Sequence, residues 1–184
     1  MTGRPIWPIF LGLAATIIVA DQLTKAWIAS SIPPGESMSV VGDYLRLVHS
    51  QNTGALFGLF RESAILFGLA SMLVIGLIVA YHARSGRSRY MSVALGLLLG
   101  GAIGNLIDRL RLGYVVDFVD AGIGSVRWYT FNVADAAISF AILFLIAAAI
   151  WPSLAGQRQD SGQTSDQEPG REPGPNPAAQ DVDV

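Results

Sequence analysis

The chain has 184 residues, of which 52% are hydrophobic and 14% are charged, against about 25% charged residues in ordinary soluble domains. It has no cysteine, which excludes disulfides, zinc–thiolate sites and thiol catalysis. His49 and His82 are its only histidines and there is no HExxH motif, so a histidine-based zinc site is not expected. The net charge is −2, and the sequence has no basic cluster of the kind that binds nucleic acid. This composition is typical of an integral membrane protein.

Four segments are long and apolar enough to cross a bilayer as helices, which takes about 20 residues. They cover residues 6–28, 63–81, 90–107 and 133–151. The first runs long for a cleavable signal peptide, and it carries Asp21 and Lys25 where a small-residue cleavage site would be expected. The sequence therefore predicts a membrane all-α protein with a bundle of four spans.

The loop between the second and third spans is short and carries Arg84, Arg87 and Arg89. The positive-inside rule places this loop in the cytoplasm. With four spans, both termini are then expected in the cytoplasm, and residues 29–62 and 108–132 are expected on the outer side.

The two outer stretches carry strand patterns. Polar and apolar residues alternate over residues 44–49, which predicts strands lying on the membrane surface. Residues 115–131 resemble two short strands around a glycine-rich turn. Four aromatic residues of the second stretch are expected in the interfacial aromatic belt: Phe118, Trp128, Tyr129 and Phe131.

The last 32 residues, 153–184, differ in composition from the rest. They hold two basic and six acidic residues and almost no large apolar side chains. Such a stretch cannot bury enough surface to offset its ordering entropy. We therefore expect a four-span membrane domain over residues 1–152, followed by a disordered acidic cytoplasmic tail.

Asp21 and Lys25 lie one helical turn apart and share a face of the first span. Two interpretations are open: a solvated pair reaching the interface, or an inward-facing pair that supports a polar site. In the third span, small residues recur at Gly96, Gly100 and Gly104, which predicts close packing against another helix.

The glycine stripe ends in a polar cluster of Asn105, Asp108 and Arg109, which packing does not explain. A second polar motif, Asn52-Thr53-Gly54, follows the first outer strand pattern. It is either an ordinary turn or a membrane-level loop that offers the Asn52 amide to a substrate.

Asp117 and Asp135 are the leading catalytic candidates, because ionisable groups within or beside lipid are costly and usually functional. Asp117 lies among valines and a phenylalanine, where desolvation favours the neutral acid. Asp135 lies in the first turn of the fourth span, after a plausible N-cap at Asn132, where backbone donors favour the carboxylate. Such a pair can share a proton and activate water. Helix capping alone is the alternative for Asp135.

Taken in order, DQLTK, NTGALFG, GGAIGNLIDR, VVDF and FNVAD resemble the five motif regions of bacterial lipoprotein signal peptidase, also called signal peptidase II. The likeness covers nearly all of residues 6–151. By motif it implies a catalytic pair of Asp117 and Asp135. The implied surrounding residues are Asp21, Lys25, Asn52, Gly54, Asn105, Asp108, Arg109 and Asn132.

The resemblance implies an aspartic endopeptidase of the bacterial cytoplasmic membrane, with its active site at the outer face beside a small β-cradle. Its substrates would be prolipoproteins, cut just before a cysteine that already carries diacylglycerol. We expect no metal or organic cofactor, a monomer, and binding of globomycin-type cyclic inhibitors. Two features depart from the family: Leu56 replaces a usually small residue, and the acidic tail has no counterpart in the family's core.

Other functions are open on the residues alone. A proton-coupled carrier also has ionisable intramembrane residues, but the second and fourth spans have almost none. A non-catalytic assembly protein predicts that both aspartates tolerate substitution. A serine–lysine protease fits poorly, because Ser30 and Ser31 are not at a convincing spacing from Lys25.

Overall fold

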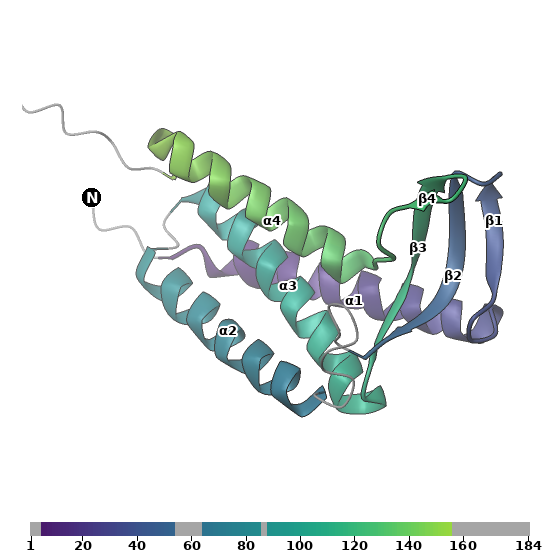
Figure 1. The fold of residues 1–184 in the computed structure, drawn as a ribbon. Helices are drawn as coiled ribbons and strands as arrows, with labels where there is room; N and C mark the ends of the chain where they lie inside the picture. Colours follow the sequence, from purple (N-terminus) through teal and green to yellow (C-terminus); the bar gives the residue numbers. More distant parts are fainter. Residues whose placement is uncertain (1–4, 54–63, 86–87, 156–184) are drawn as a thin grey trace, which may run out of the picture.

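Apolar length determines the main feature of the fold, a group of helices long enough to cross a bilayer. The computed structural model describes residues 5–53, 64–85 and 88–155 (Figure 1). Within these residues the long helices are α1 (Trp7–Ser31), α2 (Ala64–Ser85), α3 (Arg89–Leu112) and α4 (Val133–Ile150). All four have the length and hydropathy of membrane spans. The predicted four-span bundle is confirmed.

Three helices, α1, α2 and α3, continue past their predicted ends, and α3 does so by the most residues. α3 continues past residue 107 to Leu112 and ends at Gly113, whose left-handed φ of 79° suits a glycine cap. The N–H of Gly113 donates to the carbonyl of Arg109. Because apolar length alone ends a predicted span at the first charged residue, the last turn was missed. Asp108 and Arg109 therefore project from a helix and not from a loop.

α3 is the central helix and packs against α1, α2 and α4. Its glycines make this possible. A Cβ at Gly96 would lie 2.8 Å from the carbonyl oxygen of Phe10 on α1, and one at Gly101 would lie 2.5 Å from that of Ala134 on α4. Any larger side chain would push the helices apart, so the predicted small-residue ridge is confirmed and serves two neighbours.

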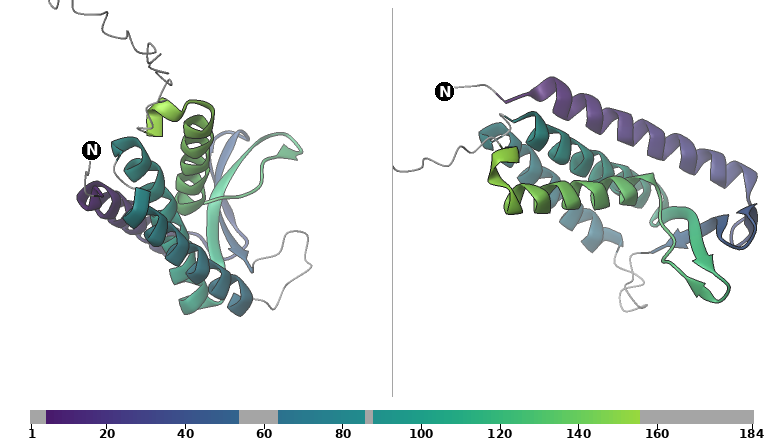
Figure 2. Two further views of the ribbon diagram at one scale, coloured as in Figure 1. Left: turned by 90° about the vertical axis from the view of Figure 1, so that its left-hand side faces the viewer. Right: turned by 90° about the horizontal axis from the view of Figure 1, so that it is seen from above.

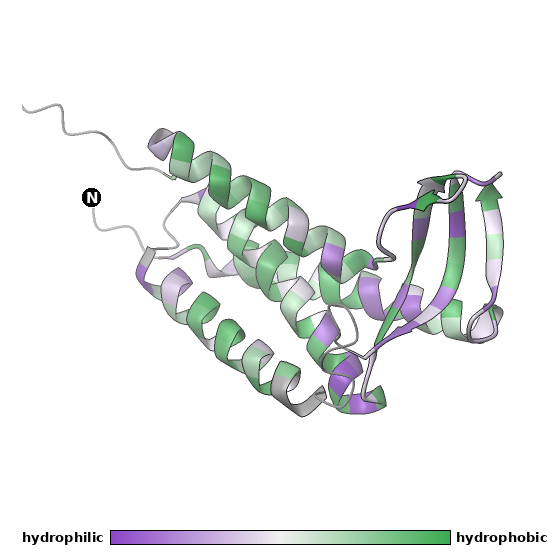
Figure 3. Cartoon of the chain, viewed as in Figure 1, coloured by the Kyte–Doolittle hydropathy of each residue, from purple (hydrophilic) through white to green (hydrophobic). Residues whose placement is uncertain are grey.

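The outer helices expose apolar side chains, as expected for lipid contact. Examples are Leu73 on α2 and Leu143 on α4. Figure 3 shows hydrophobic residues along the helices, whereas hydrophilic residues gather mainly toward the end that meets the sheet. This end of the bundle is where polar chemistry is possible.

The described residues also form one four-stranded antiparallel sheet. Its strands lie in the order β1 (Ser37–Val41), β2 (Leu45–Asn52), β3 (Val115–Ile123) and β4 (Val126–Arg127). The strands expected from the outer stretches are confirmed, although β3 is nine residues long. The register pairs Ser50 with Asp117 and Asn52 with Val115.

The inner face of the sheet packs on the end of α1. Ile28 of α1 and Ile32, the residue after α1, form a buried cluster with Val116 and Phe118 of β3. Phe118 is only 6% exposed, so its predicted place in the interfacial aromatic belt is wrong. It faces the core because side chains alternate along β3, and its neighbour Asp117 faces the other way.

A short 3₁₀ helix, η1 (Pro152–Ala155), follows α4. The hydroxyl of Ser88, just before α3, donates to the carbonyl of Leu154. The rest of the predicted tail, residues 156–184, lies outside the described residues.

Candidate active site

The candidate site lies where the helices meet the sheet (Figure 1). β3 supplies Asp117, and the first turn of α4 supplies Asp135. β2 supplies Asn52 and α3 supplies Asn105. Residues far apart in sequence therefore converge at one end of the bundle.

Asn132 joins the two aspartates. Its side-chain Nδ2 donates to Asp117 Oδ1 at 2.7 Å, and its backbone N–H donates to Asp135 Oδ2 at 3.3 Å. Its Oδ1 accepts the backbone N–H of Asp135 at 2.9 Å, so the predicted N-cap is present as a reciprocal capping box. One residue thus binds both carboxylates and holds them close together.

Asp117 is the more enclosed of the two, at 1% exposure. Its second oxygen accepts a hydrogen bond from Asn52 Nδ2 at 3.0 Å. Burial, with the negative charge of Asp135 in support, raises the pKa of Asp117 to about 6, although the bonds from Asn52 and Asn132 lower it. The carboxyl group therefore keeps its proton up to about pH 6.

Asp135 is half-buried and is fixed from α3. Asn105 Nδ2 donates to Asp135 Oδ1 at 2.8 Å. The orientation of the Asn105 amide is set by two donors to its oxygen, Lys25 Nζ at 3.0 Å and Asn132 Nδ2 at 3.2 Å. The amide nitrogen must then face Asp135.

Lys25 occupies the centre of a buried ion cluster. Its ammonium group lies 2.8 Å from Asp21 Oδ2 and 2.9 Å from Asp108 Oδ2. With the bond to Asn105, all three N–H groups have acceptors. Asp21 is 0% exposed and Lys25 3%. Of the two interpretations of this pair, the inward-facing one is confirmed and the solvated one is wrong.

The acidic members of this cluster also bind the backbone beside each candidate catalytic residue. Asp21 Oδ1 accepts the N–H of Ala134, which precedes Asp135, at 2.9 Å. Asp108 Oδ2 accepts the N–H of Val116, which precedes Asp117, at 3.1 Å. The cluster around Lys25 therefore holds α4 and β3 in position relative to each other.

Gln22 belongs to the same cluster and was not among the predicted residues. Its Nε2 lies 2.9 Å from Asp108 Oδ1, 3.2 Å from the carbonyl of Gly104 and 3.3 Å from Asp21 Oδ2. The only sequence signal was its place in the DQLTK motif. A Cβ at Gly104 would lie 2.8 Å from Asp21 Oδ2, so this glycine makes room for the cluster.

Arg109 and the Asn-Thr-Gly motif border the site. Arg109 is half-buried; its Nη1 donates to the carbonyl of Asn105 at 3.3 Å, and its guanidinium lies 5.7 Å from the Phe67 ring centroid. Asn52 contacts Asp117 and is not a bare turn residue. Gly54 lies outside the described residues, so its predicted contribution is untested.

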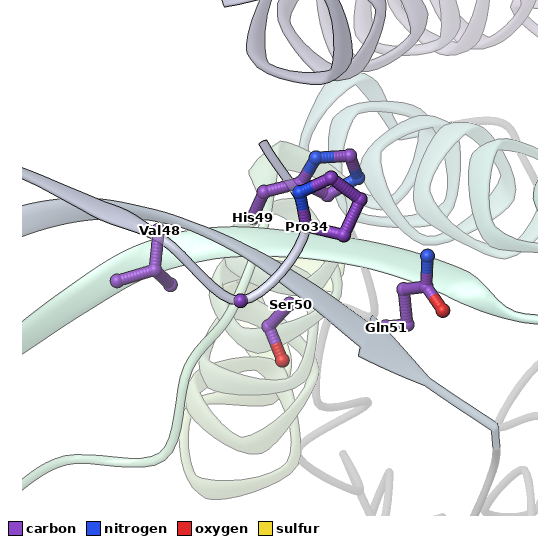
Figure 4. A pocket seen from close by; sticks show the side chains of 6 residues that line it. Pro34, Val48, His49, Ser50 and Gln51 are labelled. Carbon is purple, nitrogen blue, oxygen red and sulfur yellow. The ribbon is translucent and has the colours of Figure 1, made fainter. Parts of the chain in front are cut away.

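A surface hollow of about 500 Å³ lies beside the C-terminal half of β2 (Figure 4). Its lining includes Ser50, Gln51 and His49. The His49 ring Nδ1 lies 2.8 Å from the carbonyl oxygen of Ile32, next to the end of α1. This contact joins β2 to the residue that follows α1, which is a structural role for His49. In the described part of the chain, no group of three His, Asp or Glu side chains is placed to hold a metal ion.

A family model described as signal peptidase (SPase) II matches residues 13–151. The chain belongs to the signal peptidase II family. Curated relatives support this. A lipoprotein signal peptidase of Moorella thermoacetica is 40% identical over 145 residues, which are 78% of this chain and 94% of the relative. One of Syntrophomonas wolfei is 38% identical over 151 residues, 82% of this chain and 97% of the relative.

Solved structures agree with the signal peptidase II assignment. Two are described as bacterial membrane enzyme structures determined by the in meso method. The first has a TM-score of 0.76 and 27% identity and covers 89% of this chain and 99% of its own. The second has a TM-score of 0.75 and 29% identity and covers 82% and 98%. This signal peptidase II is a membrane protein and an aspartic peptidase that removes signal peptides from prolipoproteins.

Proposed function

We propose that Asp117 and Asp135 are the catalytic pair of this signal peptidase II. The observation that supports this most strongly is the bridge through Asn132, which binds both carboxylates. Two adjacent acids in a site of this kind can hold one proton between them, as in aspartic proteases. The pair then offers an acid and a base to the same peptide bond.

The burial of Asp117 makes it the acid. Asp135 takes a proton from water as the water oxygen attacks the scissile carbonyl carbon, and Asp117 gives its proton to the carbonyl oxygen. When the tetrahedral intermediate collapses, the C–N bond breaks. The leaving amine receives the proton held by Asp135, and Asp117 recovers a proton from the intermediate. Water is the only co-reactant.

The surrounding residues divide into two groups by their contacts. Asn105 and Asn132 bind the reacting carboxylates, whereas Asp21, Lys25 and Asp108 fix the backbone that carries them. Asn52, which also donates to Asp117, and Arg109 lie at the margin of the pair and are proposed to contact the substrate backbone. Gly54 lies outside the described residues, and the same role is proposed for it from its motif alone.

The finer substrate proposal is a diacylglyceryl-modified prolipoprotein cut just before the lipidated cysteine. The position of the pair supports it, because the site lies where apolar helices give way to the sheet. Acyl chains can remain in lipid while the peptide bond reaches the aspartates. We further propose that the enzyme acts as a monomer and that globomycin-type cyclic inhibitors compete for this site.

The proposed topology places both termini in the cytoplasm and the site at the outer face of the bacterial inner membrane, with residues 1–152 as the catalytic domain and 153–184 as the tail. Arg84 and Arg89 at the α2–α3 end support it. The chain has no cysteine, so Ser88→Cys and Ser37→Cys, the latter on the exposed edge strand β1, give single labelling sites. An impermeant maleimide added to intact cells should label only the second variant. Labelling of Ser88→Cys alone would contradict the topology.

The catalytic proposal is tested with Asp117→Asn and Asp135→Asn, purified and incubated with a lipidated precursor peptide. Mass spectrometry should show binding without cleavage for both variants. Asp43→Asn is the matched control, because Asp43 lies in the β1–β2 turn with a largely exposed carboxylate. Wild-type turnover by both site variants would refute the proposal.

A further inference from the structure

The β3–β4 hairpin exposes a patch of large apolar side chains. Ile123 is 71% exposed, Val126 77%, Trp128 74% and Tyr129 63%. Single apolar residues on a surface are common, but Ile123, Val126 and Trp128 line one shared hollow. An exposed apolar patch of this kind marks an interaction site.

The hairpin is held firmly, so this exposure is not the result of a frayed end. Arg127 forms a two-pronged ion pair with Asp120, with Nε–Oδ1 at 2.9 Å and Nη2–Oδ2 at 2.7 Å. Arg127 also donates to the carbonyl of Asp43 in the β1–β2 turn. The N–H of Gly122 donates to the carbonyl of Tyr44 at 2.9 Å. The tip therefore presents its apolar side chains on a rigid support.

The hairpin extends sideways beyond the helices, past α4 and away from α1, in both views of Figure 2. Tyr129 precedes the start of α4 at Val133 by four residues. α4 exposes Phe140 and Leu143 along its length. The exposed apolar side chains of the hairpin therefore lie only a few residues along the chain from a span that exposes apolar side chains of its own.

We propose that the tip of the β3–β4 hairpin inserts into the interface of the adjacent leaflet and anchors the sheet to the bilayer. Tryptophan and tyrosine favour this depth, because their rings are apolar and their polar groups reach the headgroups. A hollow of about 660 Å³ between Ala121, Ile123, Val126 and Trp128 gives room for lipid acyl segments. Asp120 neutralises the charge of Arg127. We therefore expect the tip to bind the bilayer through its apolar side chains, without a preference for charged headgroups.

This anchor has a consequence for the catalytic strand. β3 begins at Val115, carries Asp117 and ends at Ile123 in the hairpin. A tip fixed in the interface sets the height of the whole strand above the hydrocarbon. A link between the height of this strand and the position at which a substrate is cut rests on the proposed catalytic pair. The anchor itself does not rest on that pair.

Trp128 is a built-in reporter for the test. Replacing Trp7, Trp27 and Trp151 with Phe leaves Trp128 as the only tryptophan. The variant is reconstituted in phosphatidylcholine vesicles whose lipids carry bromine near the headgroup end of the acyl chains. A second variant that keeps only Trp27, an exposed residue of the α1 span, is the positive control.

The brominated lipid should quench about half or more of the Trp128 emission, as expected for interfacial depth, whereas aqueous iodide should quench little of it. Strong iodide quenching without lipid quenching would overturn the proposal. Protection from iodide that arises only after a substrate peptide is added would overturn it in favour of a substrate-binding face. Protection from iodide that rises with the protein-to-lipid ratio would overturn it in favour of contact with a second copy of the chain. None of these outcomes depends on catalysis by Asp117.

Discussion

Asp117→Asn should make the protein more stable at alkaline pH while removing its activity. Burial raises the pKa of Asp117 from 3.8 to about 6, so the folded state binds this proton more tightly than the unfolded state does. The stability linked to that proton is fully present below about pH 4 and is lost as the pH rises through about 6. A rise of this size corresponds to about 3 kcal/mol at pH 8.

The asparagine also changes the hydrogen bonds. Asn132 and Asn52 both donate to the Asp117 carboxylate, and a side-chain amide accepts at one end only. Retaining one bond and losing the other costs about 1 kcal/mol. The net expectation is a gain of about 2 kcal/mol at pH 8, and a loss of about 1 kcal/mol at pH 4, where the wild-type carboxyl is already neutral.

The assay is equilibrium unfolding in detergent micelles at both pH values, with cleavage of the lipidated peptide measured in parallel. The pH dependence separates this effect from general damage. Asp43→Asn, which changes a largely exposed carboxylate, should leave stability unchanged at either pH. An equal loss of stability by Asp117→Asn at both pH values would refute the reasoning, because the buried carboxylate would then cost the fold nothing.

Three further substitutions address the buried cluster. Lys25→Met leaves two buried carboxylates without a counter-ion and should lower the free energy of unfolding by about 3–5 kcal/mol. Adding Asp108→Asn should restore part of this stability but no activity, and an unchanged stability of the single variant would contradict the ion cluster. Gly104→Ala should cost about 1–3 kcal/mol by overpacking Asp21, whereas Gly76→Ala on the open surface of α2 should not destabilise. Gln22→Leu removes the donor to Asp108 and should cost about 1–3 kcal/mol, measured by the same unfolding assay.

The spans and strands were predictable because they depend on properties visible in the sequence. Apolar length indicated the four helices, and alternation indicated the strands of the sheet. The glycine spacing predicted close packing of α3, which the structure confirms at Gly96 and Gly101. The capping role of Asn132 also followed from local rules.

What escaped prediction depends on tertiary partners. The sequence could not show whether Lys25 points inward, because its acceptors Asn105 and Asp108 lie 80 and 83 positions further along the chain. Gln22 has an ordinary polar side chain, and only the fold reveals its acceptors. The backbone bonds from Ala134 and Val116 are invisible in a side-chain pattern, since any residue except proline carries an N–H.

The double role of Asn132 affects how the enzyme matures. The residue that starts the last span also binds Asp117, so the start of α4 and the assembly of the acid pair are one event. A nascent chain that has inserted only its first three spans holds Asp117 without its hydrogen-bond donor Asn132 and without the second acid, Asp135. On the proposed assignment of the catalytic pair, proteolytic competence arrives only with the final span.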